Sequence, residues 1–327
     1  MKYNKQPLIE VNNLTKKFGD FKAADNICFY IESGETFGFL GPNGAGKSST
    51  INMLTGLSRI TSGEYFVLGN DFEKNHKELK KIIGVVPDES NMYDELTGFE
   101  NLFFTGSLYG IDKRTRADRA KQLLKKFNLS EVKNKLFRYY SKGMKRKLTI
   151  AAALMHQPKI LFLDEPTTGI DIQSARDIRS LIKQLNYDGK TVFLTTHYIE
   201  EAERLCERIA FIVNGQIVKI DKTNKLLIDE NKGKTIEFVV DKVTPGIEKQ
   251  IKEQFNVKLV NIKSKSYVVI ESEDFTTIFP YIEFFNKLKI NVLEAKVLKL
   301  SLEDVFVRMT GIESNFLKTE KGESTHD

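Results

Sequence analysis

The sequence predicts an α/β protein over residues 1–220, followed by a smaller α+β domain. Its length of 327 residues suggests two domains, at roughly 150 residues per domain. Apolar segments separated by helical stretches are typical of a largely parallel sheet that is covered on both faces. After Ile220 the pattern changes to strand, helix, two strands, helix and strand, which is the order of a ferredoxin-like unit.

The predicted elements of the first part are short apolar strands and one early helix. The strands are expected at 8–11, 27–31, 36–40, 82–86, 160–163 and 191–195, and the helix at 47–57. Between residues 95 and 147 apolar residues recur at spacings near three and four, amid many Lys and Arg. This segment is predicted to be a helical insertion whose charges form a solvated face.

The later region is predicted to divide into a linker at 221–234, an accessory α+β domain at 235–312 and a flexible tail at 313–327. The accessory domain is expected to have strands at 235–240, 257–262, 267–271 and 291–297, helices at 245–255 and 275–288, and an amphipathic helix at 301–311.

Composition and charge exclude several classes of protein. Hydrophobic residues at 41% and charged residues at 29% are ordinary for a globular chain and argue against a disordered or collagen-like one. No apolar run approaches the ~18 residues of a membrane span, and the N-terminus lacks the apolar core of a secretory signal. The net charge of +6 allows contact with an anionic membrane surface or a nucleotide but does not indicate nucleic acid.

The two cysteines, Cys28 and Cys206, do not form a metal-binding pair. They exclude a disulfide framework and a structural zinc site, which fits a reducing cytoplasm. Both lie in apolar stretches and are expected to be buried.

A phosphate-binding loop is predicted where an apolar strand ends and a helix begins. The segment Gly41, Pro42, Asn43, Gly44, Ala45, Gly46, Lys47, Ser48, with Ser49 next to it, fits G-x-x-x-x-G-K-[ST]. In such a loop Lys47 reaches the β- and γ-phosphates and Ser48 ligates Mg²⁺, while the helix start favours the anion. The alternative is an accidental glycine-rich turn, which the strand and helix on either side disfavour.

A pair of carboxylates, Asp164 and Glu165, follows the apolar strand at 160–163. Asp164 is expected to hold Mg²⁺ and Glu165 to act as general base on the attacking water. Taken alone, the pair is equally consistent with a surface strand end; together with the phosphate loop, that alternative becomes the weaker one.

The segment from Tyr140 to Lys147 lies between these two motifs. Ser141 suits the N-cap of a helix starting near Gly143, and that helix start is a second anion site. If it stood alone, Ser141 would be only a helix cap. Its place before the Asp-Glu strand resembles the signature of ATP-binding cassette (ABC) ATPases, Leu-Ser-Gly-Gly-Gln. Ser141 and Gly143 are kept, whereas Lys142 and Met144 depart in a form similar to ABC ATPases of ABC-2 drug and antibiotic exporters.

This resemblance implies a P-loop NTPase fold of the ABC type over residues 5–220 and adds roles for three residues. Asp171 matches the D-loop residue that crosses the dimer interface, and His197 the switch histidine that contacts the γ-phosphate. Phe18 matches the aromatic that stacks on adenine. Without the family, His197 reads as structural and Phe18 as part of the core.

Asp88 departs from the family, which usually has Gln after the strand at 82–86. A carboxylate is an oxygen ligand for Mg²⁺ but adds negative charge near phosphates and cannot donate a hydrogen bond as an amide does. Slower hydrolysis or altered coupling is expected from this difference.

The resemblance implies an ATPase subunit of an exporter, with ATP and Mg²⁺ as cofactors. Two copies would close around two ATP molecules, with the phosphate loop of one facing Ser141 and Gly143 of the other. The segment from Asp88 to Tyr109 would dock a separate integral membrane permease, placing the chain at the cytoplasmic face of the membrane. The region from Ser301 to Phe306 is similar to the accessory domain of such ATPases.

Two other functions are open. One is a non-transport ABC ATPase acting on the ribosome or DNA, although one phosphate loop and no sustained heptads argue against it. The other is a regulatory module in which the terminal domain senses a ligand. No nucleic acid partner is expected.

Overall fold

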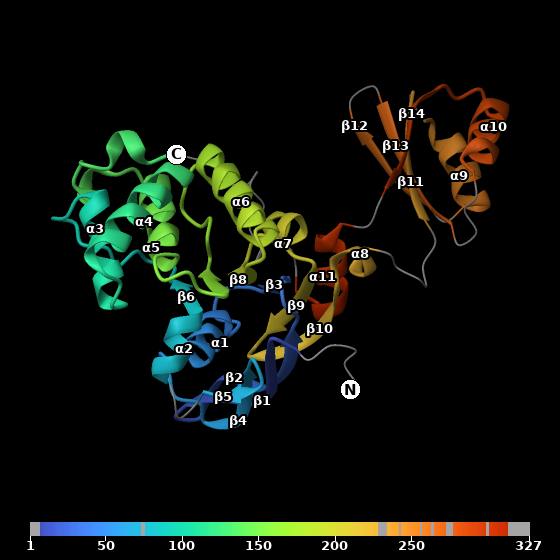
Figure 1. The fold of residues 1–327 in the computed structure, drawn as a ribbon. Coiled ribbons are helices and arrows are strands. Elements are labelled where there is room, and N and C mark those ends of the chain that lie inside the picture. The colour runs from blue at the N-terminus through green and yellow to red at the C-terminus, as the bar shows by residue number, and fades with distance from the viewer. Residues whose placement is uncertain are drawn as a thin grey trace. The chain divides into compact units, whose positions relative to one another are not determined.

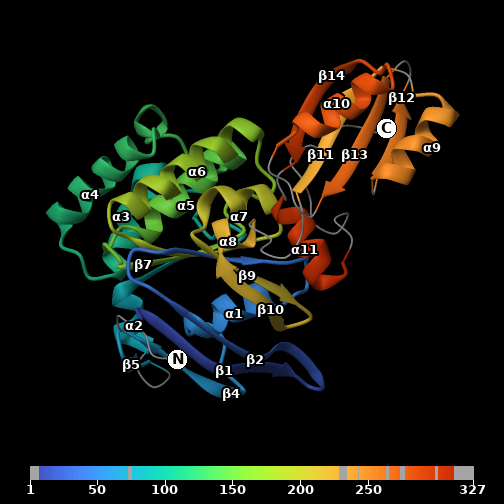
Figure 2. The ribbon, with the colours of Figure 1, turned by 90° about the vertical axis from the view of Figure 1, so that its right-hand side faces the viewer.

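The structure is a computed structural model that describes residues 7–72, 76–227, 234–241, 243–255, 257–262, 265–272, 277–298 and 301–312. The chain divides into two compact units, Asn224–Val305 and the remainder (Figures 1 and 2). The sequence placed 235–312 in one domain, whereas Phe306 belongs to the first unit, where its ring lies 5.3 Å from that of Phe211. The predicted tail at 313–327 and residues 228–233 of the predicted linker lie outside the described residues.

A six-stranded sheet forms the centre of the first unit, in the order β10-β9-β3-β8-β7-β6. All neighbours are parallel except β10, which is antiparallel to β9, so the largely parallel sheet is confirmed. The strands are β3 (Thr36–Leu40), β6 (Ile83–Val86), β7 (Ile160–Asp164), β8 (Thr191–Thr196), β9 (Arg208–Val213) and β10 (Gln216–Lys222). Every residue of β3, β7 and β8 is buried, because both faces of the sheet are covered.

A second, antiparallel sheet was not predicted. It has the order β2-β1-β4-β5, built from β1 (Ile9–Phe18), β2 (Phe21–Ile31), β4 (Ser62–Val67) and β5 (Asn70–Asp71). Only Tyr65 and Val67 of β4 are fully buried, so this strand gives little apolar signal in the sequence. The strand β9 was also not predicted, although its run of apolar residues from Ile209 to Val213 is typical of a buried strand.

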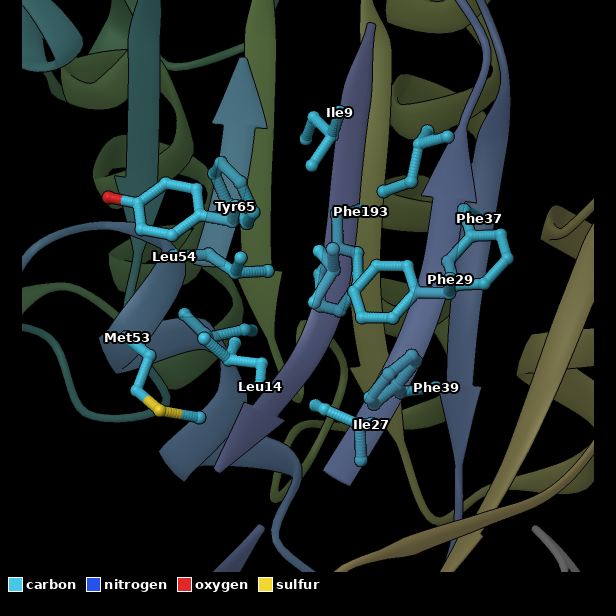
Figure 3. Packing of buried hydrophobic residues seen from close by; sticks show 14 of the residues in the cluster. Ile9, Leu14, Ile27, Phe29, Phe37, Phe39, Met53, Leu54, Tyr65 and Phe193 are labelled. Atoms are coloured by element: carbon cyan, nitrogen blue, oxygen red, sulfur yellow. The ribbon is translucent and has the colours of Figure 1, made fainter. Parts of the chain in front are cut away.

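The main core lies between these two sheets and includes the apolar face of α1 (Lys47–Leu54), which contributes Ile51, Met53 and Leu54. Figure 3 shows aromatic rings from both sheets meeting there. Phe29 of β2 lies 5.4 Å from Phe37 and 5.1 Å from Phe39, both on β3, and Phe193 of β8 lies 5.0 Å from Phe39. This packing holds β3, and therefore the loop that follows it, against the antiparallel sheet.

Helices cover the other face of the parallel sheet. These are α5 (Lys142–Ala153), which contacts β6, α6 (Ile172–Tyr187), which contacts β8, and α7 (Ile199–Leu205), which contacts β3 and β8. The predicted helical insertion is confirmed, and comprises α3 (Gly98–Leu108), α4 (Lys113–Lys126) and α5, with two short turns, η1 (Ser130–Val132) and η2 (Phe137–Tyr139), before α5. Three further short helices are α2 (His76–Ile82) in the first unit, and α8 (Thr223–Leu226) and α11 (Leu302–Thr310), which span the two boundaries of the second unit. Among the described residues, no helix is long and apolar enough to cross a membrane.

The second unit has the predicted βαββαβ order. Its elements are β11 (Lys234–Val240), α9 (Pro245–Gln254), β12 (Val257–Ile262), β13 (Lys265–Ser272), α10 (Phe279–Lys287) and β14 (Val292–Leu298). The antiparallel sheet runs β12-β13-β11-β14. Phe238 of β11 packs against Phe285 of α10 at 5.1 Å, and Ile251 of α9 lies in the same core. The unit therefore has a hydrophobic core of its own.

The expectation that both cysteines are buried is right for Cys206 and wrong for Cys28. Cys206 lies against Gly38 of β3, and burial raises the pKa of its thiol. Cys28 is exposed because it alternates on β2 with the buried residues Ile27 and Phe29. An apolar neighbourhood in the sequence does not tell which face of a strand a residue occupies.

Candidate nucleotide-binding and catalytic site

The predicted phosphate loop joins β3 to α1 and depends on glycine at specific positions. Gly44 and Gly46 have φ angles of 81° and 101°, which side chains rarely allow. A Cβ on Gly46 would also lie 2.1 Å from the carbonyl oxygen of Ala23. The β1–β2 hairpin therefore packs directly against the loop, and the first residue of α1 is Lys47. Because the first N–H groups of a helix have no partner within it, this start suits an anion.

Lys47 is buried, and its ammonium group uses all three of its donors. It donates to the main-chain oxygens of Gly41 and Pro42 at 2.7 and 3.1 Å. It also forms an ion pair with Glu165 Oε1 at 3.1 Å. The lysine of the loop and the predicted general base thus meet directly, because β3 and β7, with β8 between them, end at the same edge of the parallel sheet.

Glu165 lies at the end of β7 in the left-handed region, with φ of 48°. Its Oε2 accepts hydrogen bonds from His197 Nδ1 at 2.8 Å and from Thr168 Oγ1 at 3.0 Å. Burial raises the pKa of Glu165, but the hydrogen bond from His197 and the charge of Lys47 outweigh it and lower the pKa to about 2. The carboxylate is ionised and can only accept, so Nδ1 of His197 carries the proton in this contact.

Asp164 is buried beside Glu165, and its Oδ1 accepts a hydrogen bond from Thr195 Oγ1. Ser48 is exposed at the start of α1. A hydroxyl and a carboxylate suit Mg²⁺, which is usually bound by one or two carboxylates with phosphates and water. Among the residues that the structure describes, no group of three His, Cys, Asp or Glu is placed to hold a metal ion.

Asp88 lies in the loop after β6, where its side chain is exposed. The pKa of its carboxyl is nevertheless raised, because neighbouring protein atoms remove part of its hydration and Glu165 and Asp164 carry like charges, while the charge of Arg146 opposes the rise. Asp88 therefore shares the electrostatic field of both catalytic carboxylates. The expectation that the basic residues of the insertion are solvated is wrong for Arg146, which is buried.

Ser141, Gly143 and Asp171 form a second group at the starts of α5 and α6. Ser141 Oγ accepts from the main-chain N–H of Met144 at 3.3 Å, which is the predicted N-cap. Asp171 caps α6 by accepting from the N–H of Ser174 at 2.9 Å, and this lowers its pKa. Gly143 packs so closely on Ser174 that a Cβ would lie 2.2 Å from its Oγ. Two adjacent helix starts thus form one surface.

Phe18 ends β1 and is 58% exposed, so it is not a core residue. It pairs across the hairpin with Phe21, which is 63% exposed and was not singled out in the sequence. Lys16 Nζ lies 4.8 Å from the ring centre of Phe18. Stacking of Phe18 on adenine stays a prediction.

Glu201 of α7 is a buried carboxyl that the sequence did not reveal. Its Oε1 accepts from Thr167 Oγ1 at 2.7 Å, and the side chain has no solvent exposure. Burial raises its pKa from 4.5 to about 7, and the charge of Glu165 adds to the rise, whereas the hydrogen bond from Thr167 and the charge of Arg179 oppose it. Thr167 and Thr196 adjoin the loops of the site. The buried carboxyl of Glu201 on α7 therefore stabilises the position of these loops.

Replacing Glu201 with Gln is expected to flatten the pH dependence of stability. Between pH 4.5 and about 7 the folded state binds the proton that the unfolded chain has lost, so the free energy of unfolding falls as pH rises. The shift is equivalent to about 3 kcal/mol at pH 8. Urea unfolding from pH 4.5 to 8 measures it, with exposed Glu203→Gln on the same helix as control. Equal slopes for wild type and Glu201→Gln would show that Glu201 titrates normally.

Comparison with known proteins places the chain in a family. The sequence model of the family described as ABC transporter matches residues 24–168. The linearmycin resistance ATP-binding protein LnrL of Bacillus subtilis is 35% identical over 306 residues, covering 93% of this chain and 98% of that protein. The chain belongs to the ABC transporter family. The daunorubicin/doxorubicin resistance ATP-binding protein DrrA of Streptomyces peucetius is 38% identical over 225 residues, or 68% of each chain.

A solved ABC structure agrees in fold with this chain. A dimeric ATP-binding cassette in a post-hydrolysis state with ADP and Pi has a TM-score of 0.60 and 30% identity, over 66% of this chain and 98% of that one. The chain is therefore an ABC transporter ATP-binding subunit and an ATPase, with the P-loop NTPase fold expected from the sequence.

Proposed function

We propose that this ABC ATPase powers export of a drug-like or antibiotic compound through a separate membrane permease, by closing as a homodimer around ATP. The proposal rests on the contacts of Glu165 with Lys47, at the start of α1, and with His197, directly after β8. Two relatives that are named for drug or antibiotic resistance support the exporter class, one of them over almost the whole chain.

ATP binding would replace part of the hydrogen bonds and the ion pair that Lys47 forms in the nucleotide-free protein. Its three donors are committed to Gly41, Pro42 and Glu165, so a phosphate oxygen must replace at least one of them. Release from Lys47 leaves Glu165 held by His197 and Thr168. Mg²⁺, held by Ser48 and Asp164 with Asp88 nearby, would neutralise charge on the phosphates.

In the hydrolytic step Glu165 accepts a proton from the attacking water. A carboxylate with a pKa of about 2 is a weak base in the resting state, and loss of the Lys47 ion pair removes one cause of that low value. His197 donates through Nδ1 to Glu165 and so fixes the direction of the carboxylate. Its ring also stands at the end of β8, where the family's γ-phosphate contact is expected.

A second copy would complete each site. Ser141 and Gly143 lie at the start of α5, and Asp171 at the start of α6, whereas Lys47 begins α1 and Glu165 follows β7. The free N–H groups of α5 offer an anion site to a nucleotide bound by another copy. The dimeric relative with ADP and Pi supports this arrangement.

A permease would dock on the segment from Asp88 to Tyr109 and hold the subunit at the cytoplasmic face of the membrane. This segment presents large apolar side chains to solvent, notably Leu108 at 70%, Tyr93 at 52% and Tyr109 at 42% exposure. Exposed apolar side chains that gather in one segment are typical of an interaction site. A short amphipathic helix would cover them.

Specific ATPase activity is expected to rise with protein concentration and then level off, because each site needs two copies. Turnover per chain from nanomolar to micromolar concentration, with light scattering on the same samples, measures this. Constant turnover from particles that scatter as monomers would contradict the composite site.

Membrane recovery tests the transport assignment separately. The chain should sediment with membranes when its permease is co-expressed and stay in the supernatant without it. Recovery on ribosomes or DNA would instead favour the non-transport alternative.

A further inference from the structure

Arg146 lies on α5, five residues after the cap residue Ser141, and is only 6% exposed. Its neighbours Lys145 and Lys147 reach Asp94 and Asp177 near the surface. Arg146 instead points inward, under the loops that carry the catalytic carboxylates. A buried guanidinium is costly unless its donors are all satisfied, so its partners indicate why it is there.

Every N–H of this guanidinium donates a hydrogen bond to a main-chain oxygen. Nη1 donates to Asp88 at 2.9 Å and also to Pro87. Nη2 donates to Glu165 at 2.7 Å and also to Asp164, and Nε donates to Pro166 at 3.0 Å. An arginine has five N–H donors in a fixed planar fork, and here all five are used. One side chain thus links the loop after β6 to the loop after β7.

The linked segments are those that the chemistry needs. The loop after β6 carries Asp88, and the end of β7 carries Asp164 and Glu165. Three consecutive carbonyls, from Asp164 to Pro166, converge on the guanidinium around the left-handed φ of Glu165. A non-glycine residue in that region is strained and persists only where its surroundings hold it. The hydrogen bonds of Arg146 to these carbonyls supply much of that restraint.

We propose that Arg146 is a positioning residue, which fixes the Glu165 backbone and the Asp88 loop and ties both to the signature helix α5. It touches main chain and not the reacting atoms, so it acts through Glu165. Contact at the start of α5 by a second copy would then be transmitted to the general base through one buried side chain. The role in turnover rests on the proposed function, whereas the link between the two loops does not.

Two variants test the role of the planar guanidinium of Arg146. Arg146→Gln removes the charge and most donors, and Arg146→Lys keeps the charge but offers a single ammonium in place of a planar fork. We expect kcat to fall about 100-fold in both, since a small misplacement of a catalytic group has that effect. ATP affinity should stay within about threefold, because Lys47 and its loop do not contact Arg146. Lys126→Met is the control and should keep wild-type kcat, because Lys126 lies at the end of α4 and pairs with Asp188, outside the signature segment and both loops.

A double variant separates positioning from general damage. If Arg146 acts through Glu165, then adding Arg146→Gln to Glu165→Gln should cost almost nothing further in residual hydrolysis. A full 100-fold loss in that background, or kcat within threefold of wild type in both single variants, would overturn the proposal.

Hydrogen exchange supplies a readout that needs no activity. Amides of the two loops, at residues 88–90 and at 165, 167 and 168, should exchange faster in Arg146→Lys, while those of β3 and β8 do not change. If the wild type fails to hydrolyse ATP, the proposed function fails, yet faster exchange in these loops still supports the link. Unchanged exchange at both loops would refute it whatever the turnover.

Discussion

Glu165→Gln is expected to reduce steady-state ATP hydrolysis about 1,000-fold, within the range for loss of a general base. The amide keeps the shape of the side chain and its contacts with Thr168, but it cannot accept the proton of the attacking water. Turnover of saturating ATP by purified protein measures this. Intact hydrolysis would show that Glu165 is not the base.

The same variant should bind ATP at least as tightly as the wild type. In the resting protein Glu165 holds one of the three donors of Lys47, and a neutral amide competes less for that ammonium. Equilibrium binding of a fluorescent ATP analogue checks this. Glu200→Gln, on the exposed side of α7 and paired with Arg204, is the control and should leave both turnover and binding unchanged. Loss of binding in Glu165→Gln would indicate a damaged loop and not a missing base.

The parts of the site that the sequence predicted are those where main-chain geometry leaves few choices. A loop of the Gly41–Ser48 type has few solutions between a buried strand and a helix, and β3 has the predicted bounds, residues 36–40. Since parallel strands end at one edge, the residues after β3, β7 and β8 had to meet there. The contacts of Glu165 with Lys47 and His197 therefore follow from the shared edge of these strands together with the phosphate loop that brings Lys47 back to it.

The parts that the sequence did not reveal depend on which way a side chain points in the folded protein. Arg146 stands among Lys and Arg residues with the same composition, and only the packing of α5 turns it inward. Glu201 lies next to Glu200, yet one is fully buried and the other is partly exposed. The antiparallel sheet was missed because β4 buries too few residues to give a pattern.

Lys47→Met is the second change with a large expected effect. A phosphate bound by a charged donor gains about 1.5–3 kcal/mol per bond, so ATP affinity should fall about 100-fold and hydrolysis with it. Binding of the fluorescent analogue measures the loss. Lys22→Met is the control, because Lys22 forms an exposed ion pair with Asp25 at the hairpin surface. Binding within a few fold of wild type in Lys47→Met would refute the phosphate role.

Lys47→Met should also destabilise the nucleotide-free protein, by about 3 kcal/mol, because removal of one partner leaves the other buried charge uncompensated. Glu165 would retain His197 and Thr168 but lose its ammonium. Adding Glu165→Gln removes that stranded charge, so the double variant should recover most of the stability without recovering ATP binding. Urea unfolding of the four proteins completes the cycle. Additive losses would mean that the two side chains do not stabilise each other at rest, and then ATP would have no ion pair to displace when it enters the loop.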